Sequence, residues 1–259
     1  MPDYLDTLAR DAKQTVAQAY YENPTRNSVH SISLKKAINE SRQNAVITEV
    51  KAASPSRGTI KTDFNPAKVA REMEKGGAAG ISVLTEPKHF NGSLDYLAKV
   101  REAVKLPILM KDIIVDLVQL EAASRIGANV VLLIEAVFER GYCEVSRDEM
   151  IKQAHLKNLE VLLETHSEDE FQQAIKTDAD LIGINNRDLR TLKVDLHITE
   201  KILKKHESIS KVVVSESGVM YPADLLFLRK CGAQAFLIGS SIMMADNIEQ
   251  KVKEFVTAQ

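Results

Sequence analysis

Eight short apolar runs recur along this chain, and polar or turn-forming residues bound each of them. The segments between them, such as PAKVAREMEKGG and VQLEAASRIGA, have the apolar spacing of amphipathic helices. Several finish in Gly-Ala or a lone Gly, as expected where a helix stops and a strand begins. This alternation indicates parallel strands joined by crossover helices. The runs begin at Ala45, Gly80, Pro107, Asn129, Leu159, Asp180, Lys211 and Gln234.

The number of strand–helix units and the chain length together favour an α/β fold with a closed (β/α)8 TIM barrel. The chain has 259 residues, and barrels of this kind are typically about 250 residues long. No GxGxxG motif occurs, which argues against an open dinucleotide-binding sheet. Because no linker rich in Pro, Gly or Ser interrupts the sequence, we expect a single domain over residues 1–259.

The residues before the first predicted strand are expected to form an N-terminal helical extension over residues 1–44. A first helix is predicted from Asp3 to about Tyr21 by its apolar spacing of three or four residues. A second short helix fits SISLKKAINES, where Ser31 or Ser33 could cap the first turn. We expect these helices to cover one end of the core.

The overall composition excludes several classes of protein. A formal net charge of -2 gives no electrostatic footprint for nucleic acid or an anionic membrane. There is no apolar run of about 20 residues to span a bilayer, and MPDYLDTLARDAKQ lacks the features of a secretion signal. Cys143 and Cys231 are expected to be reduced thiols, and His89 and His166 to be loop residues without metal-ligand spacing. These features predict a soluble cytoplasmic protein without a metal site.

Charged and polar residues follow most of the predicted strands, at the point where each strand ends. In a (β/α)8 barrel these carboxyl ends line the catalytic face. Glu49 and Lys51 lie two residues apart and point to one face of a buried strand, where opposite charges are costly unless paired or used. Lysines and glutamates gathered in one desolvated mouth can shift one another's pKa toward neutrality, which suits acid–base catalysis. The strand-end set comprises Glu49, Lys51, Lys111, Asp112, Glu164, Asn185, Asn186, Arg187, Glu216 and Ser217.

Turns rich in glycine and serine follow the last two predicted strands. They are Ser217-Gly218 and Gly239-Ser240-Ser241. In this fold a phosphate often binds between the loops after strands seven and eight, beside a short extra helix. Glycines let backbone N–H groups approach the anion, which the N-terminus of a helix also favours. The substrate is therefore expected to carry a phosphate.

An ordered set of motifs covers nearly the whole chain and resembles the indole-3-glycerol phosphate synthase family. The motifs are EVKAASPS, LTEPKHFNGS, PILMKDIIV, LLETHS, GINNRDL, VSESGV and FLIGSS. The resemblance implies a carboxy-lyase of tryptophan biosynthesis. Such an enzyme converts 1-(2-carboxyphenylamino)-1-deoxyribulose 5-phosphate to indole-3-glycerol phosphate by ring closure, decarboxylation and dehydration. No cofactor is implied, and the implied partner is a phosphorylated small molecule.

The resemblance also implies catalytic roles. Lys111 resembles the general acid that protonates the carbonyl oxygen of the substrate during ring closure. Glu164 resembles the acid–base carboxylate of the family and would work with Lys51 in the later loss of water. The sequence leaves open which of these two protonates the leaving hydroxyl. Glu49 would pair with and orient a lysine.

Other positions match substrate-binding residues of the family. Asn185 and Ser217 match positions that hold substrate hydroxyls and polar neighbours. Arg187 resembles a carboxylate clamp, for which a bidentate guanidinium is well suited. Phe90 would pack on the anthranilate ring. The remaining implied binding residues are Ser54, Glu216 and Leu237, with Gly218, Gly239 and Ser240 as the phosphate cradle.

Two residues depart from the pattern of the family. The family commonly has Lys-Asp-Phe where this chain has Lys111-Asp112-Ile113. Ile113 therefore removes an aromatic wall from the pocket for the anthranilate ring. Glu135 ends the fourth predicted strand, where relatives usually carry an apolar or small residue. Our hypothesis is that Glu135 points to the rim or pairs with Lys111.

Two other functions remain as alternatives. Phosphoribosylanthranilate isomerase is also a phosphate-binding barrel, but its chemistry is usually assigned to a Cys and an Asp at strand ends, and here the first strand ends in Glu49 and Lys51. The second alternative is a barrel that binds phosphate without catalysis. A pure binding module has no need of matched acids and bases, which argues against it. The sequence does not determine the oligomeric state, although a monomer is favoured.

Overall fold

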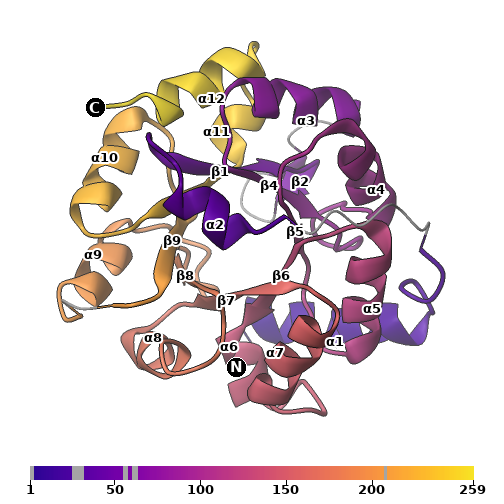
Figure 1. Cartoon of the computed structure of the whole chain (residues 1–259). Helices are drawn as coiled ribbons and strands as arrows, with labels where there is room; N and C mark the ends of the chain where they lie inside the picture. Colours follow the sequence, from indigo (N-terminus) through magenta and orange to yellow (C-terminus); the bar gives the residue numbers. More distant parts are fainter. Residues whose placement is uncertain (1–2, 25–31, 55–57, 60–63, 207–208) are drawn as a thin grey trace.

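Parallel strands close into the predicted barrel. The computed structural model describes residues 3–24, 32–54, 58–59, 64–206 and 209–259, without the side chains of Ser54 and Thr59. The strand order around the barrel is β1-β10-β9-β8-β7-β6-β5-β4 (Figure 1). All eight predicted strands are confirmed. They are β1 (Ala45–Val50), β4 (Gly80–Leu84), β5 (Ile108–Lys111), β6 (Val130–Ile134), β7 (Glu160–Thr165), β8 (Leu181–Asn185), β9 (Val212–Glu216) and β10 (Ala235–Ile238).

Helices surround the barrel and follow the strands. The four helical segments singled out in the sequence between strands correspond to α3, α5, α7 and α10. A two-stranded hairpin of β2 (Ala53–Ser54) and β3 (Gly58–Thr59), which the sequence did not predict, follows β1. The helices are α3 (Pro66–Lys75), α4 (Leu94–Ala103), α5 (Leu117–Ile126), α6 (Glu135–Glu139), α7 (Arg147–Leu156), α8 (Glu168–Ala174), α9 (His197–Leu203), α10 (Pro222–Lys230), α11 (Ser240–Met243) and α12 (Ile248–Val256).

The two helices of the N-terminal extension cover opposite ends of the barrel, so the expectation of a single covered end is wrong. In Figure 1, α2 (Leu34–Asn39) crosses the near opening, whereas α1 (Tyr4–Ala17) lies on the far side. The difference arises because the two helices contact opposite ends of the strands. α1 contacts loops that follow strands, and α2 contacts a residue at the beginning of a strand.

α2 is anchored to the amino end of the barrel by Glu160, the first residue of β7. Its carboxylate accepts hydrogen bonds from the backbone N–H groups of Leu34 (2.8 Å) and Lys35 (3.2 Å), and from the hydroxyl of Ser33. The Ser33 hydroxyl also caps the helix by accepting a bond from Lys36 N. This confirms one of the two predicted caps, and Ser31 lies outside the described residues. A negative charge at a helix N-terminus is favourable, so Glu160 both caps and docks α2.

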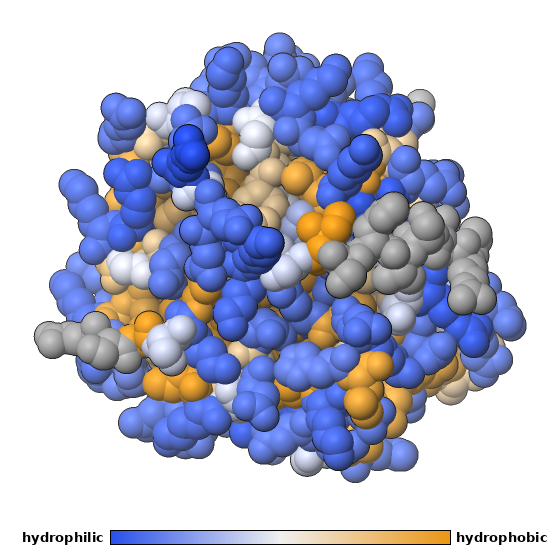
Figure 2. All heavy atoms as spheres, viewed as in Figure 1, coloured by the Kyte–Doolittle hydropathy of each residue, from blue (hydrophilic) through white to orange (hydrophobic). Residues whose placement is uncertain are grey.

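The face of the molecule that α2 covers is largely hydrophilic. Figure 2 shows hydrophobic side chains there only in small separate groups. Leu34 and Ile38, the apolar residues of α2, are buried and belong to the same core cluster as the barrel interior. The helix therefore directs its apolar face into the barrel.

α1 is anchored near the carboxyl ends of the strands. Its first turn has a capping box between Asp3 and Asp6. Arg140, at the end of α6, bonds both carboxylates at 2.7 and 3.0 Å, and Tyr142 OH donates to Asp6 at 3.0 Å. The buried residues Leu5 and Leu8 point from this helix into the barrel-interior cluster.

Alternation along the strands decides which side chains enter the barrel. Ile47, Leu109, Leu162 and Val214 belong to the interior cluster together with α1 and α2. Because side chains alternate between the two faces of a strand, the residues two positions further along also face inward. Those next positions are Glu49, Lys111, Glu164 and Glu216. The apolar interior therefore ends in a polar layer at the carboxyl end.

Two further expectations can be compared with the structure. Cys143 and Cys231 are both free thiols, as predicted. Among the described residues, no helix combines the length and apolarity needed to cross a membrane.

We expect Glu160→Gln to lower the free energy of unfolding by about 1–3 kcal/mol, because a neutral amide would replace a carboxylate that accepts bonds from three donors of α2. Urea denaturation measures the change. The matched control is Glu254→Gln, which removes an exposed pair with Lys251 and should change the stability by less than about 0.5 kcal/mol. Equal effects of the two substitutions would contradict the docking role of Glu160.

Candidate active site

A cavity of about 520 Å³ opens at the carboxyl end of the barrel. Its floor is the polar layer at the strand ends, and its walls come from α1 and from the loops after the strands. It brings together nearly all the site residues predicted from the sequence. The predicted residues that line it are Glu49, Lys51, Phe90, Lys111, Glu164, Asn185, Arg187, Glu216, Ser217, Gly218, Leu237, Gly239 and Ser240.

Lys111 lies at the centre of this polar layer. Its Nζ is 3.0 Å from Glu164 Oε2 and 2.9 Å from Glu216 Oε2. The two carboxylates come from β7 and β9, across the barrel mouth from the end of β5. Their residues are 3% and 1% exposed, so the three groups form a buried ion triad. One ammonium therefore balances two carboxyl groups.

Burial and neighbouring charge give the two carboxyls different pKa values. Burial raises the pKa of Glu216 to about 7, and the charge of Glu164 adds to the rise although Lys111 opposes it. Burial acts in the same sense on Glu164, but Lys111 and His166 outweigh it and hold that pKa below its usual value. Burial disfavours the charged form of Lys111, yet Glu164 and Glu216 outweigh this and raise its pKa. At neutral pH the triad therefore keeps Lys111 and Glu164 charged.

A glycine makes room for the triad. Gly183 on β8 pairs with Glu164 of β7 and with Val214 of β9, two residues before Glu216, and a Cβ at Gly183 would lie 2.2 Å from Glu216 Oε1. Real Cβ atoms do not approach an oxygen so closely. That same Oε1 is buried and has no hydrogen-bond partner among the described residues. The carboxyl group of Glu216 thus occupies the space of the missing side chain.

Glu49 and Lys51 form a second ion pair on β1 and just after it, with 2.7 Å between Lys51 Nζ and Glu49 Oε2. Their shared face, inferred from the two-residue spacing, is confirmed. A Cβ on Gly239 would lie 2.5 Å from Glu49 Oε2 and 2.8 Å from Lys51 Nζ. The pair therefore packs directly on the backbone at the start of α11, and the Lys51 ammonium lies beside the glycine–serine turn.

The second oxygen of Glu164 faces His166, which lies in the loop after β7 as predicted. His166 Nε2 is 3.3 Å from Glu164 Oε1, and its Nδ1 is 3.6 Å from Glu170 Oε2. Burial disfavours protonation of His166, but the carboxylates of Glu170, Glu164 and Glu216 outweigh it and raise its pKa. Asn185 also bonds the Glu164 carboxylate and lowers its pKa.

The loops after β9 and β10 meet beside Lys51. Ser217 and Gly218 have left-handed backbone conformations, with φ of 65° and 98°, which turn the chain sharply after β9. Gly239 precedes the short helix α11, which begins at Ser240. All four residues line the cavity. This arrangement matches the predicted layout of two turns and a short extra helix.

Three other residues singled out in the sequence are Arg187, Ile113 and Ser54. Arg187 donates from Nη1 to the carbonyl oxygen of Leu192 at 2.9 Å, and its backbone N–H donates to Asn185 Oδ1. Ile113, the departure from the Lys-Asp-Phe pattern, is buried and lines the cavity. Ser54 belongs to β2, and its side chain lies outside the described part of the structure.

Asp112 is a buried carboxyl group of a different kind. Tyr21 OH bonds it at 3.0 Å, Thr85 Oγ1 at 2.5 Å and the backbone N–H of Ile113 at 2.8 Å. Burial raises its pKa to about 6 although these donors oppose the rise. Asp112 thus fastens the chain after α1 to the end of β5.

The pairing of Glu135 with Lys111 is contradicted. Glu135 is the first residue of α6, and its Oε1 lies 2.6 Å from Arg147 Nη1. Lys111 is occupied by Glu164 and Glu216 instead. Ile134 faces into the barrel and lines the cavity, so Glu135, the next residue, lies on the outward-facing side of β6, where it meets the first residue of α7.

Two apolar walls of the cavity were not predicted from the sequence. Tyr4, Leu5 and Leu8 of α1 line it, although the sequence identified them only as part of a helix that covers one end of the core. The segment after β8 adds a second apolar wall. Its leucines and valine stand in a polar loop, a pattern that could have indicated a function other than core packing. These residues are Leu189, Leu192, Val194 and Leu196.

The described residues contain no cluster of three or more His, Cys, Asp or Glu side chains that could hold a metal ion. The polar groups that line the cavity include ammonium, carboxyl, amide, guanidinium and hydroxyl groups.

Several known proteins resemble this chain in sequence or in fold. Residues 5–255 match the family model of indole-3-glycerol phosphate synthase. The indole-3-glycerol phosphate synthase of Methanocaldococcus jannaschii is 46% identical over 229 residues, covering 87% of this chain and 83% of that protein. The enzyme of the same name from Campylobacter fetus subsp. fetus is 40% identical over 242 residues, covering 93% of this chain and 92% of the relative.

Among solved structures, thiamine phosphate pyrophosphorylase from Pyrococcus furiosus is similar with a TM-score of 0.62. It covers 86% of this chain and 96% of its own at 17% identity, so it supports the fold alone. Because a family model spans nearly the whole sequence and relatives above 30% identity cover most of it, this chain belongs to the indole-3-glycerol phosphate synthase family.

Proposed function

We propose that this protein converts 1-(2-carboxyphenylamino)-1-deoxyribulose 5-phosphate to indole-3-glycerol phosphate, carbon dioxide and water. The observation that carries the proposal is the Lys111 ammonium, held between two buried carboxyl groups at the floor of a cavity in a chain of this family. A protonated lysine at a desolvated site can donate a proton to a carbonyl oxygen that gains negative charge.

Ring closure joins the aromatic carbon that bears the carboxylate to the carbonyl carbon of the sugar chain. Lys111 donates its proton to the carbonyl oxygen, which becomes a hydroxyl. The ring nitrogen is left as a positively charged iminium. Glu164 and Glu216 keep the Lys111 ammonium charged before this step and fix its position.

Decarboxylation and dehydration complete the reaction. The electrons of the broken C–CO2 bond neutralise the iminium, so this step needs no further acid. The hydroxyl then leaves as water after it gains a proton, and a base removes a proton from the neighbouring carbon. Glu164 and Lys51 serve as the acid–base pair for this loss of water, with Glu49 orienting Lys51 at 2.7 Å.

The two ends of the substrate bind at different sides of the cavity. The phosphate binds the turns of Ser217-Gly218 and Gly239-Ser240, with the Lys51 ammonium beside Gly239. The anthranilate ring binds among apolar side chains, and Arg187 binds its carboxylate. These apolar residues are Leu5, Leu8, Phe90, Ile113, Leu132 and Ile134. The cytoplasmic location and the monomeric state stay predictions.

Turnover tests the proposal directly. Purified protein mixed with the carboxyphenylamino substrate should release equal amounts of carbon dioxide and a product with indole fluorescence, without added metal or nucleotide. Family membership argues against the isomerase alternative. Tight binding of the phosphorylated substrate without any turnover would favour the binding-only alternative and overturn the proposal.

Replacing the proposed acid should abolish most of the activity. We expect Lys111→Ala to lower kcat by at least about two to three orders of magnitude, the scale of a lost general acid. Steady-state kinetics measures the effect, and circular dichroism checks that the barrel still folds. The matched control, Lys105→Ala, removes an exposed lysine and should leave kcat unchanged. Near-parental activity of folded Lys111→Ala would mean that another group is the acid.

The raised pKa of Glu216 predicts how stability depends on pH. The folded pKa of about 7 lies above the ordinary value of 4.5, so the folded state loses stability relative to the unfolded state as the pH rises from 4.5 to 7. Glu216→Gln cannot ionise and escapes this loss. Relative to the parent, its free energy of unfolding should therefore rise by up to about 3 kcal/mol between pH 5 and pH 8.

Urea denaturation at the two pH values measures this difference. The control is Glu121→Gln, because Lys157 lowers the pKa of Glu121 and its titration ends below this window. Its stability relative to the parent should not change between pH 5 and pH 8. A pH-independent difference for Glu216→Gln would show that Glu216 is ionised throughout the range.

A further inference from the structure

The cavity mouth is bordered by two segments that no strand pairing holds together. Tyr4, Leu5 and Leu8 come from α1, and Phe90 comes from the loop after β4. The proposed ring site lies between them. Whatever fixes the separation of these two segments therefore also sets the width of the ring site.

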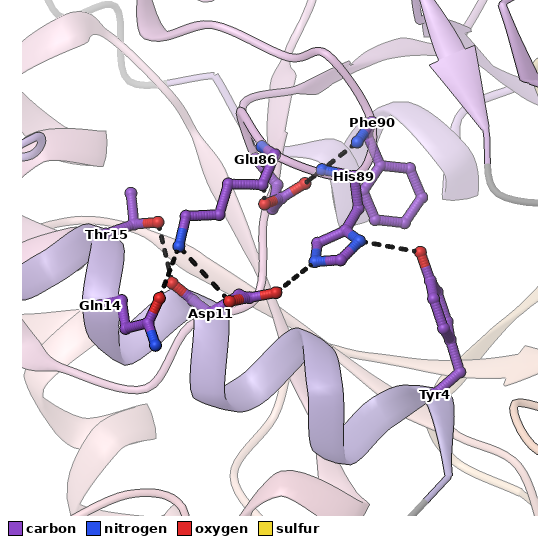
Figure 3. Close-up of polar contacts among 8 residues, drawn as sticks. Tyr4, Asp11, Gln14, Thr15, Glu86, His89 and Phe90 are labelled. Carbon is purple, nitrogen blue, oxygen red and sulfur yellow. Dashed lines mark hydrogen bonds and ion pairs between the residues drawn. The ribbon is translucent and has the colours of Figure 1, made fainter.

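His89 connects the two segments through both nitrogens of its ring. Its Nε2 lies 2.7 Å from Asp11 Oδ2, and its Nδ1 lies 3.1 Å from Tyr4 OH (Figure 3). Tyr4 and Asp11 are two turns apart on α1, and the imidazole ring spans between them. We call Tyr4, Asp11 and His89 the clasp. Lys88 supports it with bonds to Asp11 Oδ1 at 3.4 Å and Gln14 Oε1 at 3.0 Å.

A neutral histidine satisfies both bonds of the clasp. A carboxylate only accepts hydrogen bonds, so Nε2 carries the hydrogen toward Asp11 and Nδ1 accepts from Tyr4 OH. The bond from His89 is the largest cause that lowers the pKa of Asp11, which indicates a charge-assisted contact. The Tyr4 ring also packs edge-on against the imidazole, with centroids 5.6 Å apart.

One carboxylate holds the backbone of His89 together with that of Phe90. The Glu86 carboxylate, which is buried, accepts bonds from the backbone N–H groups of Lys88 (2.9 Å), His89 (2.7 Å) and Phe90 (3.0 Å) (Figure 3). The position of the imidazole therefore determines the position of the neighbouring phenyl ring. Because the imidazole is bonded to α1, Phe90 is held at a fixed distance from the leucines of that helix.

We propose that His89 is a positioning residue for the aromatic ring of the substrate, because its bonds to Tyr4 and Asp11 hold Phe90 opposite α1. His89 does not contact the reacting groups, so it acts on ring binding and leaves the proton transfers of Lys111 and Glu164 unchanged. This inference rests on the proposed function. Failure of that function would appear as a parent enzyme without turnover, whereas failure of this inference would appear in an active enzyme.

The test separates KM from kcat. We expect His89→Leu to raise KM for the carboxyphenylamino substrate about tenfold, the scale of one lost charge-assisted bond, while kcat stays within about twofold of the parent. His89→Gln, whose amide can donate to Asp11, should recover part of the loss. Tyr4→Phe keeps the aromatic wall and removes one bond of the clasp, so its KM should rise less than that of His89→Leu.

The control is Tyr142→Phe, which removes a hydrogen bond between α1 and another part of the barrel and does not touch the loop of Phe90. Its KM should equal that of the parent. An unchanged KM in His89→Leu would overturn the inference, and so would a fall in kcat alone. An equal rise in Tyr142→Phe would also overturn it, since any weakening of α1 would then suffice. If His89→Leu fails to fold, the same comparison is made with His89→Gln and Tyr4→Phe.

Discussion

Lys111 places one ammonium group within hydrogen-bond distance of two carboxyl groups that the barrel has removed from water. Each buried carboxylate would cost several kcal/mol without a counter-charge, and two at this separation cannot both ionise freely. The Lys111 ammonium stabilises the ionised forms of the two carboxyl groups to different extents. It keeps Glu164 ionised, while Glu216 is left with a pKa of about 7. Carboxyl groups with separated pKa values can take different roles in acid–base chemistry, and this difference is the basis of the proposed mechanism.

The rest of the fold brings these groups together at the carboxyl end of the barrel. The inward-facing rows of β1, β5 and β9 are apolar at their earlier positions and become polar at their last position, as in Val214 followed by Glu216. Gly183 leaves the space that Glu216 fills, and Gly239 lets the Glu49–Lys51 pair approach the backbone. α2 covers the opposite end of the barrel, and α1 forms the wall of the cavity. The barrel strands thus carry most of the reacting groups, while α1 and the loops after the strands shape the binding site.

Much of this arrangement could be predicted from the sequence because a closed parallel barrel has simple rules. Apolar runs identify the strands, and strand ends such as Lys111 and Glu164 must converge on one face. Other features depend on contacts between distant residues. An apolar stripe shows that a helix packs, but not on which end, so the opposite positions of α1 and α2 were missed. Glu135 was misplaced because it follows Ile134, which faces inward, so alternation turns Glu135 toward the surrounding helices. The contact between His89 and Asp11 joins residues 78 positions apart and has no local signal in the sequence.

A crystal structure with a bound substrate analogue, in which the ketone is reduced to an alcohol, would test the central role of Lys111 most directly. The hydroxyl of the analogue occupies the position of the carbonyl oxygen that the proposed acid protonates. We expect Lys111 Nζ within about 3.2 Å of this hydroxyl, with the phosphate against the turns of Ser217-Gly218 and Gly239-Ser240. A complex in which the hydroxyl contacts Lys51, while Lys111 remains bonded only to Glu164 and Glu216, would contradict the account.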